Sequence, residues 1–368
     1  MADTYRLKRC RECGFPRYLD YLIRWNDNGT ITHNLQNDFR GVIQHYSFIH
    51  GLLPRIGSQL GLSIDHIAFE AQRNASNAVF QALYDKRPSI RFSCRFGFVK
   101  RLVVEQFNKM AVATGMCYSN TLEYVPGKYG VARIKNPFDI NLMAANVVGG
   151  FEVLEGMPFK HSLEQEGDDS YVIRVEATGE KPEISERMAL EYPTVLPGNR
   201  QYEKCSRCHA PRAIGSLKWM ENEGTILDKL SGDRVVVLDG YMISAVFREM
   251  AKELGDEVND ILVDAQKDWV IDHAEQLGLV KGEVPLSGEA RGKAYRDYMD
   301  LILLYGQGNP TALEIGDSQI KVEIENPYEP MILAGSLQGL FEAIEKVAGG
   351  VTWESVKEGA VTYAVQPA

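Results

Sequence analysis

Two short cysteine motifs carry the residues best suited to chemistry in this sequence. Cys10 and Cys13 form one Cys-x-x-Cys pair, and Cys205 and Cys208 form a second. Thiolates at this spacing bind zinc or iron–sulfur clusters, or undergo redox exchange. Structural zinc prefers four ligands in a tetrahedron, whereas each motif supplies two. We therefore expect the two motifs to come together and to bind one structural zinc ion through four cysteines.

Other uses of these cysteines stay open. An iron–sulfur cluster takes the same four ligands and is the less favoured alternative to zinc. Each motif could instead use a histidine, such as His33 or His209, or bind no metal at all. A thioredoxin-like redox pair is disfavoured because neither motif lies in a βαβ pattern. Cys205-x-x-Cys208-His209 also matches the c-type haem motif, but Gly14 takes the place of His209 in the first motif, so we expect no haem.

The two motifs mark the starts of two copies of one domain. The matches continue in order along the chain: Trp25 with Trp219, Leu60-Gly61 with Leu254-Gly255, Ala71-Gln72-Arg73 with Ala265-Gln266-Lys267, Asn136-Pro137-Phe138-Asp139 with Asn326-Pro327-Tyr328-Glu329, and Phe151-Glu152 with Phe341-Glu342. Collinear matches with so little drift in spacing indicate that a whole domain was duplicated. We predict copy 1 at residues 1–178, a proline-containing linker at 179–197 and copy 2 at 198–368.

Each copy has the pattern of an α+β domain. In copy 1 we predict a hairpin over 18–32, helices over 39–60, 64–83, 99–113 and 140–155, and strands over 121–125, 130–134, 159–162 and 171–176. The predicted fold class is α+β: two pseudo-symmetric copies of a helix-rich domain with a small antiparallel sheet, each preceded by a Cys-x-x-Cys zinc-knuckle hairpin.

Two repeated features of the last long helix have structural interpretations. We expect Asn136 to cap this helix, Pro137 to take its first position and Asp139 to complete a capping box; residues 326–329 predict the same in copy 2. Glu152 and Glu342 follow aromatic residues in these helices. Because both copies retain them, a buried hydrogen-bonded role is expected rather than a catalytic one.

The carboxy-terminal part of each copy resembles vinyl-reductase-type (4VR) domains over 134–175 and 324–365. Both stretches contain a strand that ends in Asn-Pro-aromatic-acidic, a helix with Gly and then Phe-Glu, and a final hairpin. The 4VR family binds small molecules, includes sensor domains of some aromatic-responsive bacterial activators, and shares its fold with subunits of the TRAPP trafficking complex. Many members carry zinc-binding cysteines in the last hairpin, where this chain has acidic residues such as Glu164, Glu166, Asp168, Glu354 and Glu358. The resemblance therefore implies a ligand-binding domain without the family's own metal site.

Residues that differ between the copies are the candidates for ligand contacts. We predict a small hydrophobic or aromatic ligand, bound by side chains among His45, Tyr46, Phe48, Phe96, Tyr241, Phe247 and Trp269. The alternative is that these residues are ordinary core, because ligand pockets and cores use the same residue types. Cys94 and Cys117 have no counterparts in copy 2 and are expected to be small buried hydrophobes.

Composition limits the other partners. The formal net charge is −10, which argues against nucleic acid or a membrane as a partner, although a local basic patch stays open. The first ten residues lack the apolar core of a signal peptide, and no run of apolar residues is long enough to cross a bilayer, so we expect a cytoplasmic protein.

The sequence contains no Gly-x-Ser-x-Gly, phosphate-loop or His-Glu-x-x-His motif, and we predict no catalytic residue. We therefore favour a binding protein that acts as a sensor, carrier or accessory factor. A catalytic or non-catalytic subunit of a larger metabolic enzyme complex, docked through the knuckles, is the alternative. A scaffold without ligand is a third hypothesis.

Overall fold

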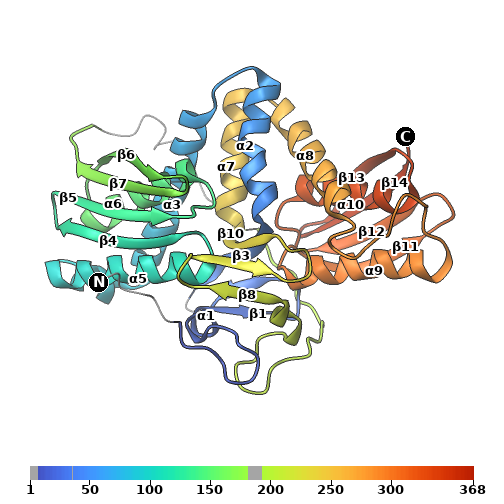
Figure 1. Ribbon diagram of the computed structural model, residues 1–368, viewed down its shortest axis with the longest axis horizontal. Helices are drawn as coiled ribbons and strands as arrows, with labels where there is room; N and C mark the ends of the chain where they lie inside the picture. Colours follow the sequence, from blue (N-terminus) through green and yellow to red (C-terminus); the bar gives the residue numbers. More distant parts are fainter. Residues whose placement is uncertain (1–6, 35, 181–192) are drawn as a thin grey trace.

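Three antiparallel sheets and the helices packed against them form the protein, whose computed structural model describes residues 7–34, 36–180 and 193–368 (Figure 1). Copy 1 contains α1 (Arg17–Leu22), β1 (Ile23–Trp25), β2 (Ile31–His33), β3 (Gln36–His45), α2 (Tyr46–Leu60), α3 (Asp65–Asp85), α4 (Pro88–Ser93), α5 (Gly97–Thr114), β4 (Tyr118–Val125), β5 (Tyr129–Lys135), α6 (Ile140–Glu155), β6 (Phe159–Gly167) and β7 (Ser170–Ala177). Copy 2 contains η1 (Arg212–Ser216), β8 (Leu217–Met220), β9 (Thr225–Asp228), β10 (Arg234–Asp239), α7 (Gly240–Leu254), α8 (Glu257–His273), α9 (Gly288–Leu304), β11 (Asn309–Ile315), β12 (Ile320–Glu325), α10 (Pro330–Glu345), β13 (Gly349–Lys357) and β14 (Ala360–Pro367).

The same order of elements recurs in the two copies. Each copy begins with a knuckle and a hairpin, continues through a strand and helices, and ends in a four-stranded antiparallel sheet. The strand orders of these sheets, β4-β5-β7-β6 and β11-β12-β14-β13, are equivalent. The predicted α+β class with two pseudo-symmetric copies is confirmed. Most of the predicted linker, 179–197, lies outside the described residues.

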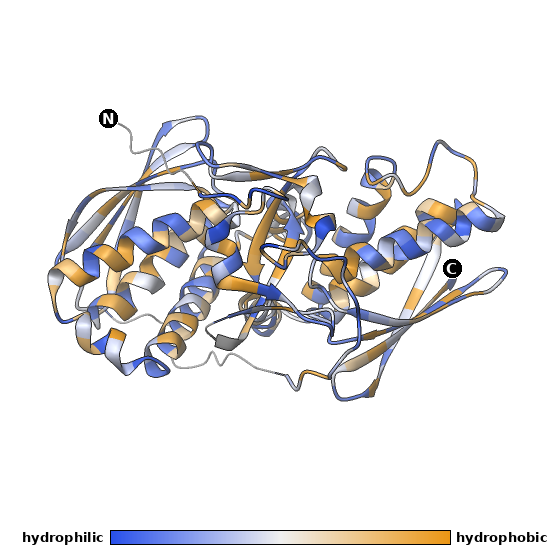
Figure 2. Ribbon diagram, turned by 90° about the horizontal axis from the view of Figure 1, so that it is seen from below, coloured by the Kyte–Doolittle hydropathy of each residue, from blue (hydrophilic) through white to orange (hydrophobic). Residues whose placement is uncertain are grey.

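A six-stranded sheet joins the two copies, with the order β1-β2-β3-β10-β9-β8. Each copy supplies three strands, and the antiparallel pair of β3 and β10 forms the join, with Ile43 opposite Val237. Val42, Ile43, Val235 and Val236 are fully buried, so this sheet has a core on both of its faces. Figure 2 shows helices on both sides of the central strands.

The amino-terminal part of each copy packs against the carboxy-terminal part of the other. Helix α2 of copy 1 contacts α8 of copy 2, and α7 of copy 2 contacts α3 of copy 1, so that α2 and α7 stand together at the centre (Figure 1). The indole nitrogen of Trp25 donates to the carbonyl of Leu304 at 2.8 Å, and that of Trp219 donates to the carbonyl of Ala113 at 2.9 Å. The duplicated chain is therefore interlocked, as an exchanged dimer would be.

The predicted cap at the Asn-Pro motif is wrong. Helix α6 begins at Ile140, and the cap is Asp139, whose side chain accepts a hydrogen bond from the Leu142 amide at 2.8 Å. In copy 2, Glu329 precedes α10, with no side-chain cap bond.

The two asparagines of this motif instead join the copies. Asn136 and Asn326 adopt left-handed backbone, with φ of 49° and 53°. Asn136 Nδ2 donates to the carbonyl of Glu223 at 2.9 Å, and Asn326 Nδ2 donates to that of Asn28 at 3.1 Å. Each asparagine therefore binds the hairpin turn of the opposite copy. Gly224, in one of these turns, lies so close to the backbone of Cys117 and Tyr118 that no side chain fits there.

Two expected elements of copy 1 differ in the structure. The helix predicted over 39–60 is a strand up to His45 and a helix from Tyr46, because the apolar residues 42–43 pair with β10 in the central sheet. The hairpin predicted over 18–32 is shortened to β1 and β2, since α1 takes residues 17–22. No helix within the described ranges combines the length and apolar composition needed to cross a bilayer.

Glu152 and Glu342 both form the expected structural hydrogen bonds, although only Glu152 is buried and Glu342 is half-buried. Glu152 accepts hydrogen bonds from Arg73 and, at 3.1 Å, from the amide of Phe159 at the start of β6. Glu342 accepts from the amide of Gly349 at the start of β13, also at 3.1 Å. Each carboxylate thus fixes the strand that follows its helix.

Candidate metal centre and ligand cavity

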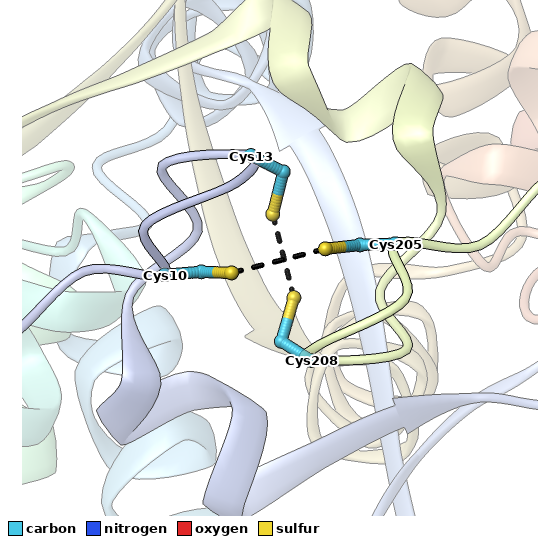
Figure 3. Close-up of side chains that lie close together, drawn as sticks. All are labelled: Cys10, Cys13, Cys205 and Cys208. Atoms are coloured by element: carbon cyan, nitrogen blue, oxygen red, sulfur yellow. Dashed lines mark hydrogen bonds between the residues drawn. The ribbon is translucent and has the colours of Figure 1, made fainter.

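Four cysteines from the two knuckles converge on one point, as the sequence predicted. Their sulfur atoms all lie within 4.8 Å of one another and are directed toward a common centre (Figure 3). Cys10 Sγ lies 3.8 Å from Cys205 Sγ, and Cys13 Sγ lies 3.4 Å from Cys208 Sγ. Three of the thiols are buried and that of Cys13 is half-buried. The cluster could hold one metal ion.

The backbone of each knuckle presents its two thiols in the same way. The amide of Gly14 donates to the carbonyl of Cys10 at 3.0 Å, and the amide of His209 donates to that of Cys205 at 3.0 Å. Gly14 and His209 both have positive φ, at 78° and 58°. His209 is therefore the counterpart of Gly14 in the turn. Its side chain is exposed, and neither it nor His33 belongs to the metal-binding group.

The donor set fits a tetrahedral ion. Zinc–sulfur bonds of about 2.3 Å place tetrahedral sulfurs about 3.8 Å apart, close to the observed separations. Hydrogen bonding from the Cys13 amide lowers the pKa of Cys10 to about 7, whereas burial raises the pKa of Cys13 and of Cys208. A bound cation would favour the thiolate form of all four.

Basic side chains surround this cluster. Lys8, Arg9, Arg11, Arg17 and Arg207 line a hollow of about 560 Å³ together with Cys10 and Cys208. Four thiolates around a divalent ion carry a net charge of −2, which these residues would offset. Below the knuckles, Phe15 packs edge-on against Trp25 and Trp219, with ring centroids 5.7 and 5.5 Å apart, so the centre lies over a core built from both copies.

A second feature is an apolar cavity of about 210 Å³ inside the copy 1 half. Helices α3, α5 and α6 and the sheet of β4, β5 and β7 form most of its wall, and β10 and α7 of copy 2 complete it through Val237, Asp239 and Met242. The copy 1 wall includes Val79, Phe80, Leu83, Val104, Phe107, Ala111, Met143, Val147, Phe151 and Ile173. The exchange of helices is therefore part of the cavity's construction.

Five of the polar side chains in the cavity wall form two hydrogen-bonded groups, one of three residues and one of two. Ser119 donates to Asn108 Oδ1 at 2.7 Å, and Asn108 Nδ2 donates to Thr121 at 2.8 Å. Ser76 and Asn146 form the second group through Asn146 Oδ1. The Nδ2 group of Asn146 is buried and has no hydrogen-bond partner among the described residues. A donor is thus available at a wall that is mostly apolar.

The corresponding space in the copy 2 half is nearly filled. Its volume is about 10 Å³, and it is lined by Gln44, His45 and Phe48 of copy 1 and by Gln266, Trp269, Tyr298, Leu301, Ile302, Tyr305 and Gln307 of copy 2. His45 and Asp239 are equivalent, since each ends the central-sheet strand of its copy, β3 or β10, and directly precedes the helix that follows, α2 or α7.

Larger side chains account for the difference between the two halves. The paired tryptophan hydrogen bonds align Ala113 with Leu304, and hence Ala111 with Ile302 and Thr114 with Tyr305. The repeated Ala-Gln motif likewise places Ala75 where copy 2 has Trp269. Each change toward copy 2 adds volume, so copy 2 closes the space that copy 1 leaves open.

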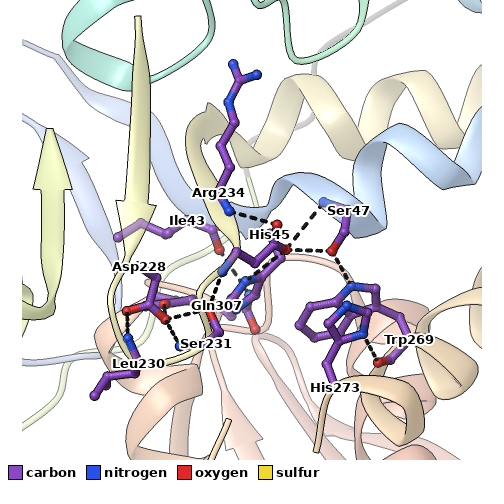
Figure 4. Close-up of polar contacts among 12 residues, drawn as sticks. Ile43, His45, Ser47, Asp228, Leu230, Ser231, Arg234, Trp269, His273 and Gln307 are labelled. Atoms are coloured by element: carbon purple, nitrogen blue, oxygen red, sulfur yellow. Dashed lines mark hydrogen bonds and ion pairs between the residues drawn. The ribbon is translucent and has the colours of Figure 1, made fainter. Parts of the chain in front are cut away.

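The structure brings together three of the seven predicted ligand residues. His45, Phe48 and Trp269, from different copies, line the small copy 2 space, with the His45 and Trp269 rings 4.6 Å apart (Figure 4). The other four are dispersed: Tyr46 stacks on His50, Tyr241 and Phe247 are buried, and Phe96 is exposed. None of the seven residues lines the copy 1 cavity. The signal that marks the cavity is the size of aligned residues rather than their aromatic character.

A serine, a histidine and an aspartate also meet near the copy 2 space. The Ser47 hydroxyl accepts from Trp269 Nε1 at 2.7 Å (Figure 4). It donates to Asp233 Oδ2 at 2.5 Å, and His45 Nδ1 lies 3.5 Å from the same carboxylate oxygen. A nucleophilic serine must instead donate to the histidine. The serine here bonds to the carboxylate, so this trio is not arranged as a catalytic triad.

Because the carboxyl group of Asp239 is buried, we expect the stability of the protein to depend on pH. The Oδ1 atom of Asp239 accepts from the amides of Tyr241 and Met242 at 2.9 and 3.1 Å, and burial raises the pKa of Asp239 from near 3.8 to about 7. The folded chain therefore holds this proton more tightly than the unfolded chain. The resulting stability is complete below about pH 4 and declines by up to about 1.4 kcal/mol per pH unit until about pH 7.

The variant Asp239→Asn keeps the helix cap and removes the titration. We expect its free energy of unfolding to exceed that of the wild type near pH 8, with the difference shrinking toward about pH 5. Urea denaturation across this range measures it. Parallel pH curves for the two proteins would contradict the buried, proton-binding role of Asp239.

Comparisons with known proteins give structural likenesses only. No family model and no curated protein sequence matches the chain. Among solved structures, the phenol-responsive sensory domain of the transcription activator PoxR, with phenol, is 15% identical with a TM-score of 0.33, and the match covers 41% of this chain and 85% of that one. A point mutant of the T. Tengcongensis H-NOX protein is 12% identical (TM-score 0.26; 35% and 74% covered), and an IWP-051-bound H-NOX from Shewanella woodyi is 14% identical (TM-score 0.25; 36% and 73% covered). Similarity at this level does not define what this chain binds.

Proposed function

We propose that the protein binds one small hydrophobic or aromatic molecule in the copy 1 cavity and acts as a sensor, carrier or accessory factor. The observation that carries this proposal is the contrast between the copies, an apolar space of about 210 Å³ in one half and about 10 Å³ in the other. Native interiors are close-packed, and voids lower stability. Copy 2 fills the equivalent space with larger side chains, so a void retained in copy 1 is best explained by a bound ligand.

The volume defines the size of the ligand. An engineered apolar cavity of about 150 Å³ in another protein binds benzene, whereas pockets for drug-sized molecules begin near 300 Å³. The cavity here lies between them, so a substituted single ring or two fused rings fit it. The unpartnered Asn146 Nδ2 favours a ligand that carries one hydrogen-bond acceptor.

The metal centre has a structural role in this proposal. Zinc bound by Cys10, Cys13, Cys205 and Cys208 would hold the two knuckles together and so fix the exchanged arrangement that completes the cavity. The resemblance of each copy to 4VR domains agrees with a ligand-binding function. None of the six cysteines forms a disulfide, which suits the reducing cytoplasm where we place the protein.

Titration with aromatic ligands of graded size tests the function. We expect toluene-sized or naphthalene-sized molecules to saturate the protein at one per chain. They should also raise its unfolding free energy by about 2.7 kcal/mol at a hundredfold excess over Kd. Calorimetry gives the stoichiometry, and denaturation gives the stabilisation. A protein that no apolar ligand of this size range stabilises would contradict the proposal.

A further inference from the structure

Four large apolar side chains lie exposed on α4, the turn that follows it and the start of α5. Phe92, Phe96, Phe98 and Leu102 are 58%, 53%, 66% and 59% exposed. The rings of Phe96 and Phe98 are 6.0 Å apart, and Phe98 and Leu102 share one face of α5 because they are four residues apart. Isolated exposed apolar residues are ordinary, but a contiguous group marks an interaction surface.

The same segment is strongly basic. No acidic residue occurs between Asp85 and Glu105, whereas the stretch holds Lys86, Arg87, Arg91, Arg95, Lys100 and Arg101. The side chains of Lys86, Arg91, Arg95 and Arg101 are exposed. The Arg95 guanidinium lies 4.7 Å from the centre of the Phe92 ring, which places charge directly over the apolar group. This concentration of positive charge stands out in a chain of net charge −10.

Copy 2 provides an internal comparison. The tryptophan hydrogen bonds align α5 with α9. In this alignment Glu289 is equivalent to Phe98, and Lys293 is equivalent to Leu102. Helix α9 carries charges of both signs at its exposed start. The basic and aromatic surface therefore belongs to copy 1 alone, as the open cavity does.

We propose that this basic–aromatic surface, residues 86–102, docks on an anionic phospholipid bilayer. Phenylalanine and leucine enter the boundary between headgroups and acyl chains, while arginine and lysine meet the negative surface. None of the four apolar side chains lines the copy 1 cavity, the copy 2 space or the hollow beside the knuckles, and a fluid bilayer, unlike a protein partner, needs no groove. The net charge of the whole chain, which argues against a membrane, conceals this local asymmetry.

Co-sedimentation of the full-length protein with lipid vesicles tests the proposal. We expect binding to vesicles of phosphatidylcholine mixed with phosphatidylserine, and little binding to pure phosphatidylcholine. The double variant Phe96→Ser/Phe98→Ser should lose at least about tenfold in affinity, since two buried rings no longer enter the bilayer. Each of Arg91→Gln, Arg95→Gln and Arg101→Gln should cost about fivefold, and added salt should weaken binding further.

Matched control variants come from copy 2. Val284 and Arg296 are also exposed, and Val284→Ser and Arg296→Gln should bind vesicles as the wild type does. Equal urea midpoints for all variants exclude unfolding as a cause of lost binding. Absence of binding to phosphatidylserine vesicles at low salt would overturn the proposal, as would unchanged binding of the phenylalanine variant. Preferential binding to DNA or to an acidic polypeptide, lost in the same variants, would assign the surface to that partner instead.

Discussion

The variant Cys10→Ser is expected to lose its metal ion and to unfold at much lower urea concentration than the wild type. One serine leaves three thiolates, and a structural zinc site uses all four. Apparent zinc-binding free energies in small folded zinc domains are about 10–16 kcal/mol, so even partial coupling to folding predicts a loss of more than about 3 kcal/mol. Elemental analysis together with urea denaturation, with and without a chelator, measures both effects.

The position of the cluster sharpens this expectation. Cys10 and Cys205 come from different copies, and their sulfurs lie 3.8 Å apart. Cys205→Ser should therefore have the same effect as Cys10→Ser, with one zinc ion per chain in the wild type and none in either variant. Cys117→Ala is the control, because burial raises the pKa of this distant thiol to about 12 and keeps it protonated. Two metal ions per chain, or a Cys10→Ser protein that keeps its metal, would contradict a shared site. Bound iron together with visible absorption would show that the four cysteines hold an iron–sulfur cluster instead of zinc.

The shared centre could be predicted from sequence because ligand chemistry and duplication both pointed to it. Two thiols cannot complete a tetrahedron, and a second pair stands at the same place in the second copy. The helices over 64–83 and 99–113 were also predictable, since each is a long periodic segment whose pattern does not depend on distant pairing.

The exchange of helices between the copies could not be predicted in this way. Residues 39–45 have apolar spacing that suits a helix, and only pairing with β10 makes them a strand. Likewise, Asn136 has the type and position of a helix cap, but its side chain binds the turn at Glu223 of the other copy. Both outcomes depend on contacts between residues far apart in sequence, which local propensity does not contain.

The open cavity of copy 1 was not predicted, for a different reason. Aromatic residues such as Trp269 and His45 drew attention because they occur in one copy only, yet in copy 2 they fill space. The wall of the open copy 1 cavity differs from the copy 2 wall because it has the small residues Ala111 and Thr114, which leave volume free. A comparison of aligned residue sizes, after the exchange is known, finds the open cavity, whereas a search for aromatic residues does not.

Filling the copy 1 cavity in the manner of copy 2 is expected to abolish ligand binding. The double variant Ala111→Ile/Thr114→Tyr introduces the residues that occupy the equivalent positions at Ile302 and Tyr305. A ligand that fits the open space should lose at least about a hundredfold in affinity, while overpacking costs the fold only about 1–3 kcal/mol. Calorimetric titration with the ligand that saturates the wild type measures the loss. An unchanged affinity would place the ligand elsewhere.

The reverse change tests the same idea from the other side. Trp269 is buried in the copy 2 space, so Trp269→Ala should cost about 3–5 kcal/mol and open a second apolar cavity. The number of ligands bound per chain should then rise from one to two, with the second site weaker because Tyr305 still narrows it. Trp353→Ala is the matched control, since Trp353 is exposed on β13 and its loss should change neither stability nor stoichiometry. A Trp269→Ala protein that gains the cavity but still binds one ligand per chain would show that cavity volume alone is not sufficient for binding. The hydrogen-bonded pair of Ser76 and Asn146, which only copy 1 possesses, would then be the next feature to test.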